Sequence, residues 1–143
     1  MAIRKIQTIG IALIIILTFI LAGCDQAADS TSEGRYQYTS YDSAGTALVN
    51  GWFTMNFTDA DTFTGEWHFM PIDNPENIGP QTGDGELQGV LREGSVSIEL
   101  NPQYRDNNIE LSGVFTEDHM SGTWIWSSLS GPTSQGTFEA VKE

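Results

Sequence analysis

Apolar and polar residues alternate along nearly the whole chain from Tyr36 onward. In the segment 47–57, ALVNGWFTMNF, polar residues separate the apolar Val49, Phe53 and Met55. Successive side chains of a β-strand point to opposite faces, so a period of two predicts half-buried strands. No helical repeat longer than a turn interrupts the pattern. It predicts eight strands, at 36–41, 47–57, 63–69, 85–91, 95–100, 109–115, 122–126 and 136–140.

A second pattern is a glycine followed two residues later by a large apolar residue. Because strand residues two apart share a face, each glycine should point inward beside a bulky side chain. Inward glycines let a strand bend sharply and make room for a neighbouring ring, as at the corners of small barrels. The pairs are Gly51-Phe53, Gly65-Trp67, Gly85-Leu87, Gly89-Leu91, Gly113-Phe115, Gly122-Trp124 and Gly136-Phe138.

The chain also contains a weak internal repeat. Residues 57–69, FTDADTFTGEWHF, and 115–126, FTEDHMSGTWIW, share Phe-Thr-acid, a turn and then Gly-x-Trp. Each copy has the composition of a strand end, a tight turn and the start of the next strand. Repeated hairpins of this kind predict a meander.

These patterns predict an all-β domain over residues 35–143, built as an eight-stranded antiparallel up-and-down meander. Such a meander can close into a small barrel or fold as a two-sheet β-sandwich. We favour the closed barrel, because closure removes exposed edges and explains the inward glycines. The pattern resembles small lipocalin-like and avidin-like barrels in strand count, strand length and Gly-x-Trp pairs. No binding-site motif of either family is matched, so the resemblance implies no site residues.

The connections divide between two ends of such a meander. The short ones, at 58–61, 92–94 and 116–119, alternate with three long ones, at 71–84, 101–108 and 128–134. All the long loops should therefore gather at one end, opposite the end at which the first strand begins. Binding usually resides on loops held by a rigid scaffold, so the long-loop end is the first candidate site.

The first 24 residues form a separate unit. A positive start with Arg4 and Lys5 precedes an apolar run from 9 to 22, shorter than the roughly 20 apolar residues of a membrane-spanning helix. The run ends in LAGC, residues 21–24, which resembles the lipobox of bacterial lipoproteins. The alternative is an uncleaved signal anchor.

The lipobox resemblance implies a lipid-modified cysteine and a cellular location. Residues 1–23 would be a signal peptide, the Cys24 thiol would carry a diacylglyceryl group, and the new N-terminus would be acylated, for example with palmitate. Two or more chains anchor a protein stably. The protein would then sit in the bacterial cell envelope, facing the periplasm or the exterior. Asp25 resembles an inner-membrane retention signal, but the choice of inner or outer membrane stays open.

Residues 24–34 contain no large apolar side chain and are expected to form a flexible tether. The whole chain has a net charge of −13, and loss of Arg4 and Lys5 would make it −15. That charge argues against binding nucleic acid or anionic lipid through the domain.

Candidate catalytic chemistry is sparse. His68 shares a strand face with Glu66, a spacing that could supply half a metal site, although a solvent-facing polar pair is the simpler explanation. His119, in a turn beside two acids, is most simply a surface residue. A hydrolytic nucleophile has no visible partners, because the sequence contains no G-x-S-x-G and its one cysteine lies in the lipobox.

Oxygen-rich loops offer a calcium hypothesis. Ca²⁺ takes several carboxylate and carbonyl oxygens, but turns demand the same residue types, and no EF-hand spacing is present. No other cofactor is indicated. The candidate calcium ligands are Asp73, Glu76, Asp84 and Asp106.

The inward aromatic rings offer another hypothesis. An eight-stranded barrel is either just filled by side chains or keeps room for one small ligand. Short strands with this many rings favour a filled interior; otherwise a small apolar ligand would bind there. The candidate lining residues are Phe53, Trp67, Phe69, Trp124 and Trp126.

Three functions remain. The first is a non-enzymatic lipoprotein that binds a ligand or partner protein at its long-loop end or in its interior. The second is a solid-core structural or interaction module without a ligand. The third, an enzyme such as a hydrolase, has the least support.

Overall fold

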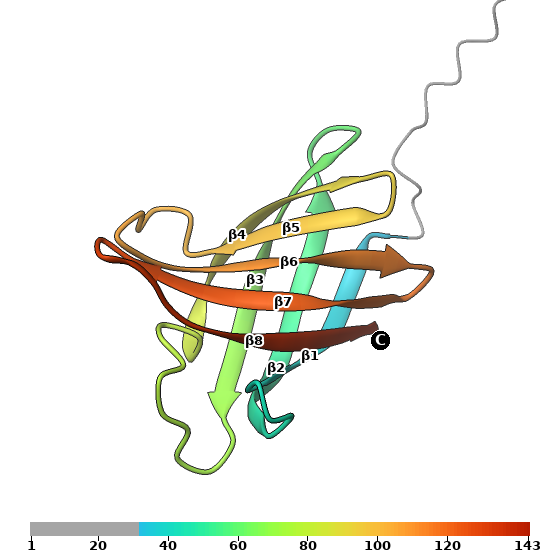
Figure 1. Ribbon diagram of the computed structural model, residues 1–143. Coiled ribbons are helices and arrows are strands. Elements are labelled where there is room, and N and C mark those ends of the chain that lie inside the picture. Colours follow the sequence, from blue (N-terminus) through green and yellow to red (C-terminus); the bar gives the residue numbers. More distant parts are fainter. Residues whose placement is uncertain (1–31) are drawn as a thin grey trace, which may run out of the picture.

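The computed structural model describes residues 32–143, which form a closed barrel of eight antiparallel strands in sequence order (Figure 1). Each strand pairs with its neighbours in the chain, and β1 pairs with β8, so the predicted barrel is confirmed and the sandwich is rejected. No helix in this part of the chain is long and apolar enough to span a membrane. The strands are β1 (Gly34–Tyr41), β2 (Ala47–Phe57), β3 (Thr62–Pro71), β4 (Gly83–Arg92), β5 (Ser95–Leu100), β6 (Asn107–Thr116), β7 (His119–Ser128) and β8 (Gly131–Lys142).

Aromatic rings fill the middle of the barrel. The Tyr38 ring stacks on Phe69 at 4.2 Å between centroids and lies 5.9 Å from the Phe138 ring. A second stack joins Tyr36 to Phe53 at 5.4 Å. Each buried aromatic removes about 150–250 Å² from water, so these rings dominate the energetics of the core. Their mutual contacts favour a filled interior over an internal ligand pocket.

Inward glycines allow the walls to approach the rings and one another. Phe63 lies so close to Gly89 that a Cβ on the glycine would collide with its ring. Gly113 and Gly122 face each other directly across β6 and β7, where a Cβ on either would strike the opposite backbone. The glycine pattern therefore has the steric role that the sequence predicted.

The β7–β8 connection differs from the prediction. The sequence SLSGPTS predicted a long loop at 128–134, but β8 begins at Gly131 and the connection is only 129–130. Serine, glycine and proline are typical of turns, yet here they continue the ladder, with a register shift after Trp126. Pro132, which lacks an N–H, is tolerated because it lies at the start of the strand.

The two ends of the barrel differ in their connections. At one end the turns are short, at 58–61, 93–94 and 117–118. The opposite end carries 42–46 and 129–130, together with the two long loops at 72–82 and 101–106. We call it the long-loop end; it faces the left in Figure 1, with the β5–β6 loop above and the β3–β4 loop below, and β1 starts at the other end.

Two residues of the expected tether pack against the short-turn end. The buried Ser32 carbonyl accepts a hydrogen bond from the Tyr36 hydroxyl at 2.7 Å. A Glu33 carboxylate oxygen accepts the backbone N–H of Phe57 at 3.1 Å. The ordered body therefore includes these two residues, while Cys24 and the rest of the lipobox lie outside the described residues.

Candidate functional site at the long-loop end

A cleft of about 350 Å³ lies at the long-loop end. Its walls come from β3, the start of β4 and the two long loops. This volume is at the lower end of the roughly 300–1,000 Å³ typical of small-molecule sites. We call it the loop-end cleft, and it is lined by Trp67, Pro80, Thr82, Asp84, Asn101, Tyr104 and Asn107.

The β3–β4 loop is fastened onto the barrel by a buried glutamine. The Gln81 amide donates to the Ile78 carbonyl at 2.8 Å and accepts from the Tyr38 hydroxyl at 3.3 Å. Burial also raises the pKa of Tyr38 well above its usual range, so the phenol stays a donor. Gln81 was not predicted from the sequence, because its burial depends on how the loop folds back over the core.

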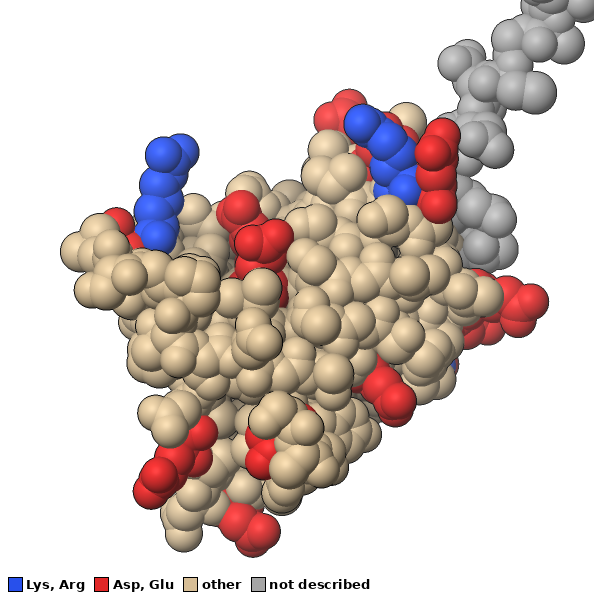
Figure 2. All heavy atoms as spheres, viewed as in Figure 1, with Lys and Arg blue, Asp and Glu red and all other residues tan. Residues whose placement is uncertain are grey.

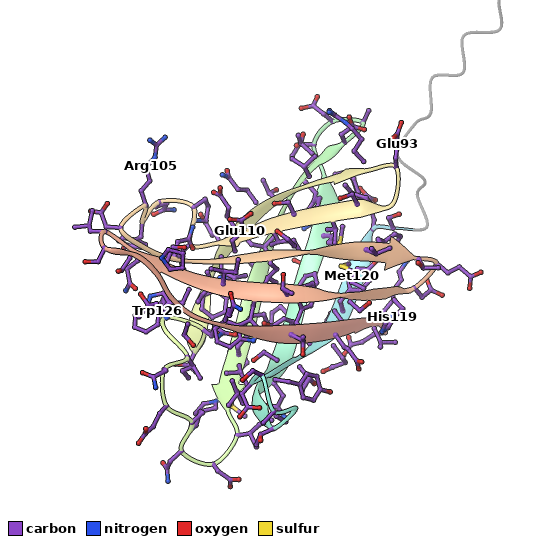
Figure 3. The ribbon with its side chains drawn as sticks, viewed as in Figure 1. Glu93, Arg105, Glu110, His119, Met120 and Trp126 are labelled. Atoms are coloured by element: carbon purple, nitrogen blue, oxygen red, sulfur yellow. The ribbon has the colours of Figure 1, made fainter. Side chains whose placement is uncertain are left out.

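The same loop rests on Trp126 at the rim. Gly79 lies so close to this indole that a Cβ would stand 2.5 Å from the ring. The Trp126 N–H donates to the Asn107 side-chain oxygen at 2.6 Å. Figure 3 shows Trp126 at the long-loop end of β7. Its polar edge is therefore satisfied, and it holds loop and strand together.

The β5–β6 loop presents an aromatic ring to solvent. Asn101 adopts a left-handed conformation with φ 62°, and its carbonyl accepts the Tyr104 backbone N–H at 2.9 Å. The turn leaves the Tyr104 side chain 65% exposed. A single exposed ring is common on protein surfaces, but this one also lines the loop-end cleft. Tyr104 was not singled out in the sequence, although it is the only aromatic residue in the two long loops.

Two tryptophans occupy matching positions on opposite sides of the barrel. Trp67 on β3 pairs with Gly85, and Trp124 on β7 pairs with Gly136. In both cases the indole Nε1 lies 2.6 Å from where a Cβ on that glycine would stand. Both belong to the Gly-x-Trp copies of the internal repeat, so the repeat extends to the packing of the rings.

The two indoles differ in their hydrogen bonding. Trp124 Nε1 donates to the backbone carbonyl of Tyr41 at 2.9 Å. Trp67 Nε1 is buried, in a side chain only 2% exposed, and has no hydrogen-bond partner. An unsatisfied buried donor costs about 1–3 kcal/mol, so such groups are rare and require an explanation. Trp67 also lines the loop-end cleft, although its Nε1 has almost no accessible surface.

Asn101 occupies the place in the Trp67 corner that Tyr41 occupies in the Trp124 corner. Tyr41 ends β1 opposite Thr137, the residue after Gly136. Asn101 follows β5 and donates its N–H to Glu86, the residue after Gly85. The Asn101 Oδ1 would lie 2.7 Å from a Cβ on Gly85, yet it does not accept the indole proton. Donor and acceptor thus stand near the same glycine without bonding.

A ladder of polar and aromatic side chains crosses the outer wall beside the cleft. Arg35 lies 4.2 Å over the Trp52 ring, which stacks on His68 at 6.0 Å. His68 pairs through Nδ1 with Asp84, its direct neighbour on β4. The strand pattern predicted Glu66 as the neighbour of His68, whereas its partner in the structure is Asp84. Because Asp84 also lines the cleft, the ladder fixes one carboxylate of the site.

The candidate calcium ligands are not gathered. Among residues 32–143 no group of three or more His, Cys, Asp or Glu could hold a metal ion. Of the four carboxylates, only Asp84 lines the loop-end cleft. Asp73, Glu76 and Asp106 are exposed in the loops, and His119 begins β7 at the short-turn end.

The candidate lining rings divide between the interior and the cleft. Phe53, Phe69 and Trp124 are buried among other side chains of the core. Trp67 belongs to the core but also reaches the cleft, and Trp126 lies partly buried at the rim. A ligand inside the barrel stays a prediction, while the cleft offers an opening beside one of these rings.

Two further hollows lie on the outer wall over β2–β5, with volumes of about 370 and about 700 Å³. Their polar lining consists mainly of exposed side chains such as Thr64, Gln88 and Glu86. Gln88 already donates to Glu99 at 2.9 Å. These groups reach water or each other, so the two hollows lack the unmet hydrogen bond found in the loop-end cleft.

Neither a scan against protein-family models nor a search of curated proteins finds a match to this chain. Geometry and sequence therefore carry the functional argument.

Proposed function

We propose that this protein is a lipid-anchored lipoprotein of the bacterial envelope whose barrel binds a small ligand in the loop-end cleft. The lipobox at 21–24 supports the anchor on Cys24. The cleft lies at the end opposite the start of β1, so a lipid tether would leave it facing away from the membrane. The proposed function is binding, and the cleft is its site.

The observation that carries the proposal is the buried, unpartnered indole N–H of Trp67, a residue that lines the cleft. The corresponding N–H of Trp124 has a hydrogen-bond acceptor within the protein, whereas the N–H of Trp67 has none. Binding sites commonly combine an apolar cleft with a few polar groups that fix the ligand's orientation. A bound ligand would supply the missing acceptor and offset the cost of the buried donor.

Native mass spectrometry of the full chain, purified in detergent from its own host, tests this function. We expect a retained small molecule in the wild type and in Leu129→Ala, because Leu129 is 84% exposed at the same end but does not line the cleft. The double variant Asn101→Ala/Tyr104→Ala should lose that molecule. Retention by the double variant, or no retained molecule in any form, would contradict the proposal.

The anchor is tested separately. Cys24→Ser should move the protein from the membrane fraction to the soluble one and abolish labelling by an alkyne analogue of palmitate. Unchanged membrane association without labelling would favour an uncleaved signal anchor instead.

A second candidate is an interaction module, favoured by the uncharged outer surface of β7. This strand contains no Asp, Glu, Lys or Arg, although the chain has 19 acidic residues. Figure 2 shows a wide uncharged area over β6–β8 between scattered acids. Charge-depleted surfaces are typical of protein interfaces. Crosslinking in the host envelope through a photoreactive residue at Thr123 would identify such a partner, and no crosslink would argue against it.

A further inference from the structure

We propose that the ligand of the loop-end cleft is a neutral saccharide. This inference rests on the proposed function and names the chemical class of the ligand. It follows from three properties of the cleft: the hydrogen-bonding groups at the Trp67 corner, the charge of its lining, and the exposed ring at its rim.

The hydrogen-bonding groups call for a hydroxyl. Trp67 Nε1 can only donate, and Asn101 Oδ1 can only accept, and both lie beside Gly85. Because Nε1 is buried, a ligand reaches it only if the lining of the cleft moves; a hydroxyl that enters there can accept from the first and donate to the second. A carboxylate or phosphate oxygen could accept the indole proton, but it would meet the Asn101 amide oxygen unless that amide flips to present its NH₂ group. An ammonium group would donate to Asn101 and leave the indole unmet.

The charge of the cleft disfavours anions. Its lining contains the carboxylate of Asp84 and no lysine or arginine. Arg105, the one cation of the β5–β6 loop, projects away from the barrel in Figure 3. The net charge of −13 adds a long-range repulsion for negatively charged ligands. The pairing of Asp84 with His68 leaves that carboxylate partly engaged outside the cleft. A neutral ligand therefore fits best.

The rim of the cleft offers apolar surfaces for the face of a sugar ring. Tyr104 is 65% exposed and Pro80 lies in the opposite loop, so both present carbon surfaces at the opening. One face of a pyranose ring carries C–H groups, which pack on aromatic rings, while its edge carries hydroxyls. An aromatic rim above a donor and an acceptor thus matches the two-sided chemistry of a saccharide. A purely apolar ligand would leave Trp67 Nε1 without an acceptor.

The matching corner shows why Gly85 is needed. At Gly136 the space beside the glycine is taken by the Tyr41 carbonyl, which satisfies Trp124. At Gly85 the three nearest atoms to such a Cβ are side-chain atoms of Trp67 and Asn101. The Trp67 corner is therefore the copy of the repeat in which no backbone carbonyl accepts the indole proton.

The test is a titration of the full chain in detergent with neutral gluco-, galacto- and manno-configured pentasaccharides. Sulfated forms of the same pentasaccharides and n-decanol serve as the anionic and apolar comparisons. In ¹⁵N-labelled protein, we expect at least one neutral pentasaccharide to move the Trp67 indole N–H signal while the Trp124 signal stays in place. The sulfated forms and decanol should leave both signals unchanged.

Variants separate binding from folding. Tyr104→Ala, Asn101→Ala and Trp67→Phe should each weaken pentasaccharide binding by about tenfold, the equivalent of one lost contact. Leu129→Ala should bind like the wild type. Because Tyr104 is exposed and Asn101 lies in a loop, these two variants test the site even if Trp67→Phe folds poorly.

The failures are distinguishable. If mass spectrometry finds a cleft-dependent ligand but no neutral pentasaccharide shifts the Trp67 signal, the saccharide assignment is wrong and the binding function stands. If a sulfated pentasaccharide or decanol binds better than every neutral form, the assignment is likewise overturned. If no molecule is retained and none of the probes binds, both proposals fail.

Discussion

The corners around Trp67 and Trp124 are two versions of one structure. Each tryptophan follows a Gly-x step of the internal repeat, lies across from a glycine, and brings its Nε1 to the same distance from that glycine. In the Trp124 corner the Tyr41 carbonyl accepts the indole proton. In the Trp67 corner no group does. The difference lies in one acceptor, supplied by the end of β1 and not by the end of β5.

The cause is the way the neighbouring strand ends. The turn after β1 keeps Tyr41 in the ladder, with its carbonyl against Gly136. Beyond β5, Asn101 turns into a left-handed conformation, and its carbonyl is engaged by Tyr104. The same turn that removes the acceptor from Trp67 also raises the Tyr104 ring at the rim. The Trp124 corner therefore stabilises the barrel through an internal hydrogen bond. The Trp67 corner lacks that bond and lies beside an opening.

Replacing Gly136 or Gly85 by alanine should give the largest difference in stability between the two corners. In Gly136→Ala the new Cβ would collide with the Tyr41 backbone carbonyl, which cannot rotate away. We expect a loss of about 3 kcal/mol, at the upper end for overpacking. In Gly85→Ala the Cβ meets side-chain atoms of Trp67 and Asn101. The Asn101 side chain can move, although the buried Trp67 ring has to shift as well, so the loss should be smaller, about 1–2 kcal/mol. Both losses can be measured by urea unfolding.

If Gly136→Ala and Gly85→Ala lost equal amounts of unfolding free energy, the two corners would be equally rigid. That result would contradict the difference proposed between them. Because the alanine at Gly85 would also fill the space beside the indole, this variant should bind pentasaccharide less tightly while remaining folded.

Replacing Trp124 or Trp67 by phenylalanine should give the next largest difference in stability between the two corners. Trp124→Phe removes ring volume and the hydrogen bond to Tyr41, with an expected loss of about 2–3 kcal/mol. Trp67→Phe removes similar volume but also an unsatisfied donor, and these two effects oppose each other. We expect a change of less than about 1 kcal/mol in the free energy of unfolding. A loss at Trp67 as large as that at Trp124 would show that its N–H has a partner.

The sequence predicted the frame of both corners but not their difference. Alternation in segments such as 63–69 located the strands, and the inward glycines two residues before a bulky side chain favoured the closed barrel. Trp67 was identified as an inward ring. Whether its N–H meets a carbonyl depends on where β5 ends and how Asn101 turns, a matter of one residue of register. The burial of Gln81 likewise depends on how its loop folds over the core.

Loop composition was a poorer guide than strand alternation. Gly131 and Pro132 indicated a long loop, but they continue β8. The carboxylates of the true loops indicated calcium, but the turns point Asp73 and Asp106 to solvent. Turn-forming residues report local backbone preferences, whereas a site requires side chains from separate loops to converge.

Alkaline titration tests whether the two corners belong to one cooperative unit. Burial, and to a smaller extent the charge of Asp118, raises the pKa of Tyr36 from 10.0 to about 12. Its contribution to stability is therefore complete below pH 10 and is lost as the pH rises from 10 toward 12. We expect the indole signals of both corners to disappear together in this range.

Tyr36→Phe is the control for the alkaline titration. It lacks the ionisable group, so its stability should fall less steeply in this pH range, although the lost bond to Ser32 lowers it by about 1 kcal/mol at neutral pH. Loss of the Trp67 signal well before that of Trp124 would show that the corners unfold separately.

The smallest effect concerns Asp42, which follows Tyr41 and affects one corner alone. One of its carboxylate oxygens accepts the backbone N–H groups of Thr46 at 2.8 Å and Ala44 at 2.9 Å. These bonds, that of Thr46 foremost, lower the pKa of the Asp42 carboxyl below its ordinary value. Asp42 thus stabilises the fold above about pH 4 and loses this contribution as the pH falls through its folded-state pKa. Protonation should loosen the turn that positions the Tyr41 carbonyl.

An NMR titration from neutral to acid pH would measure this effect. The Trp124 indole signal should shift with the lowered pKa of Asp42, and the shift should vanish in Asp42→Asn, which keeps the size of the side chain. The Trp67 signal should not follow the same titration, because no protein carbonyl accepts its proton. A common titration of both signals would mean that a change at one corner reaches the other through the core, and the two corners could then not be assigned separate roles.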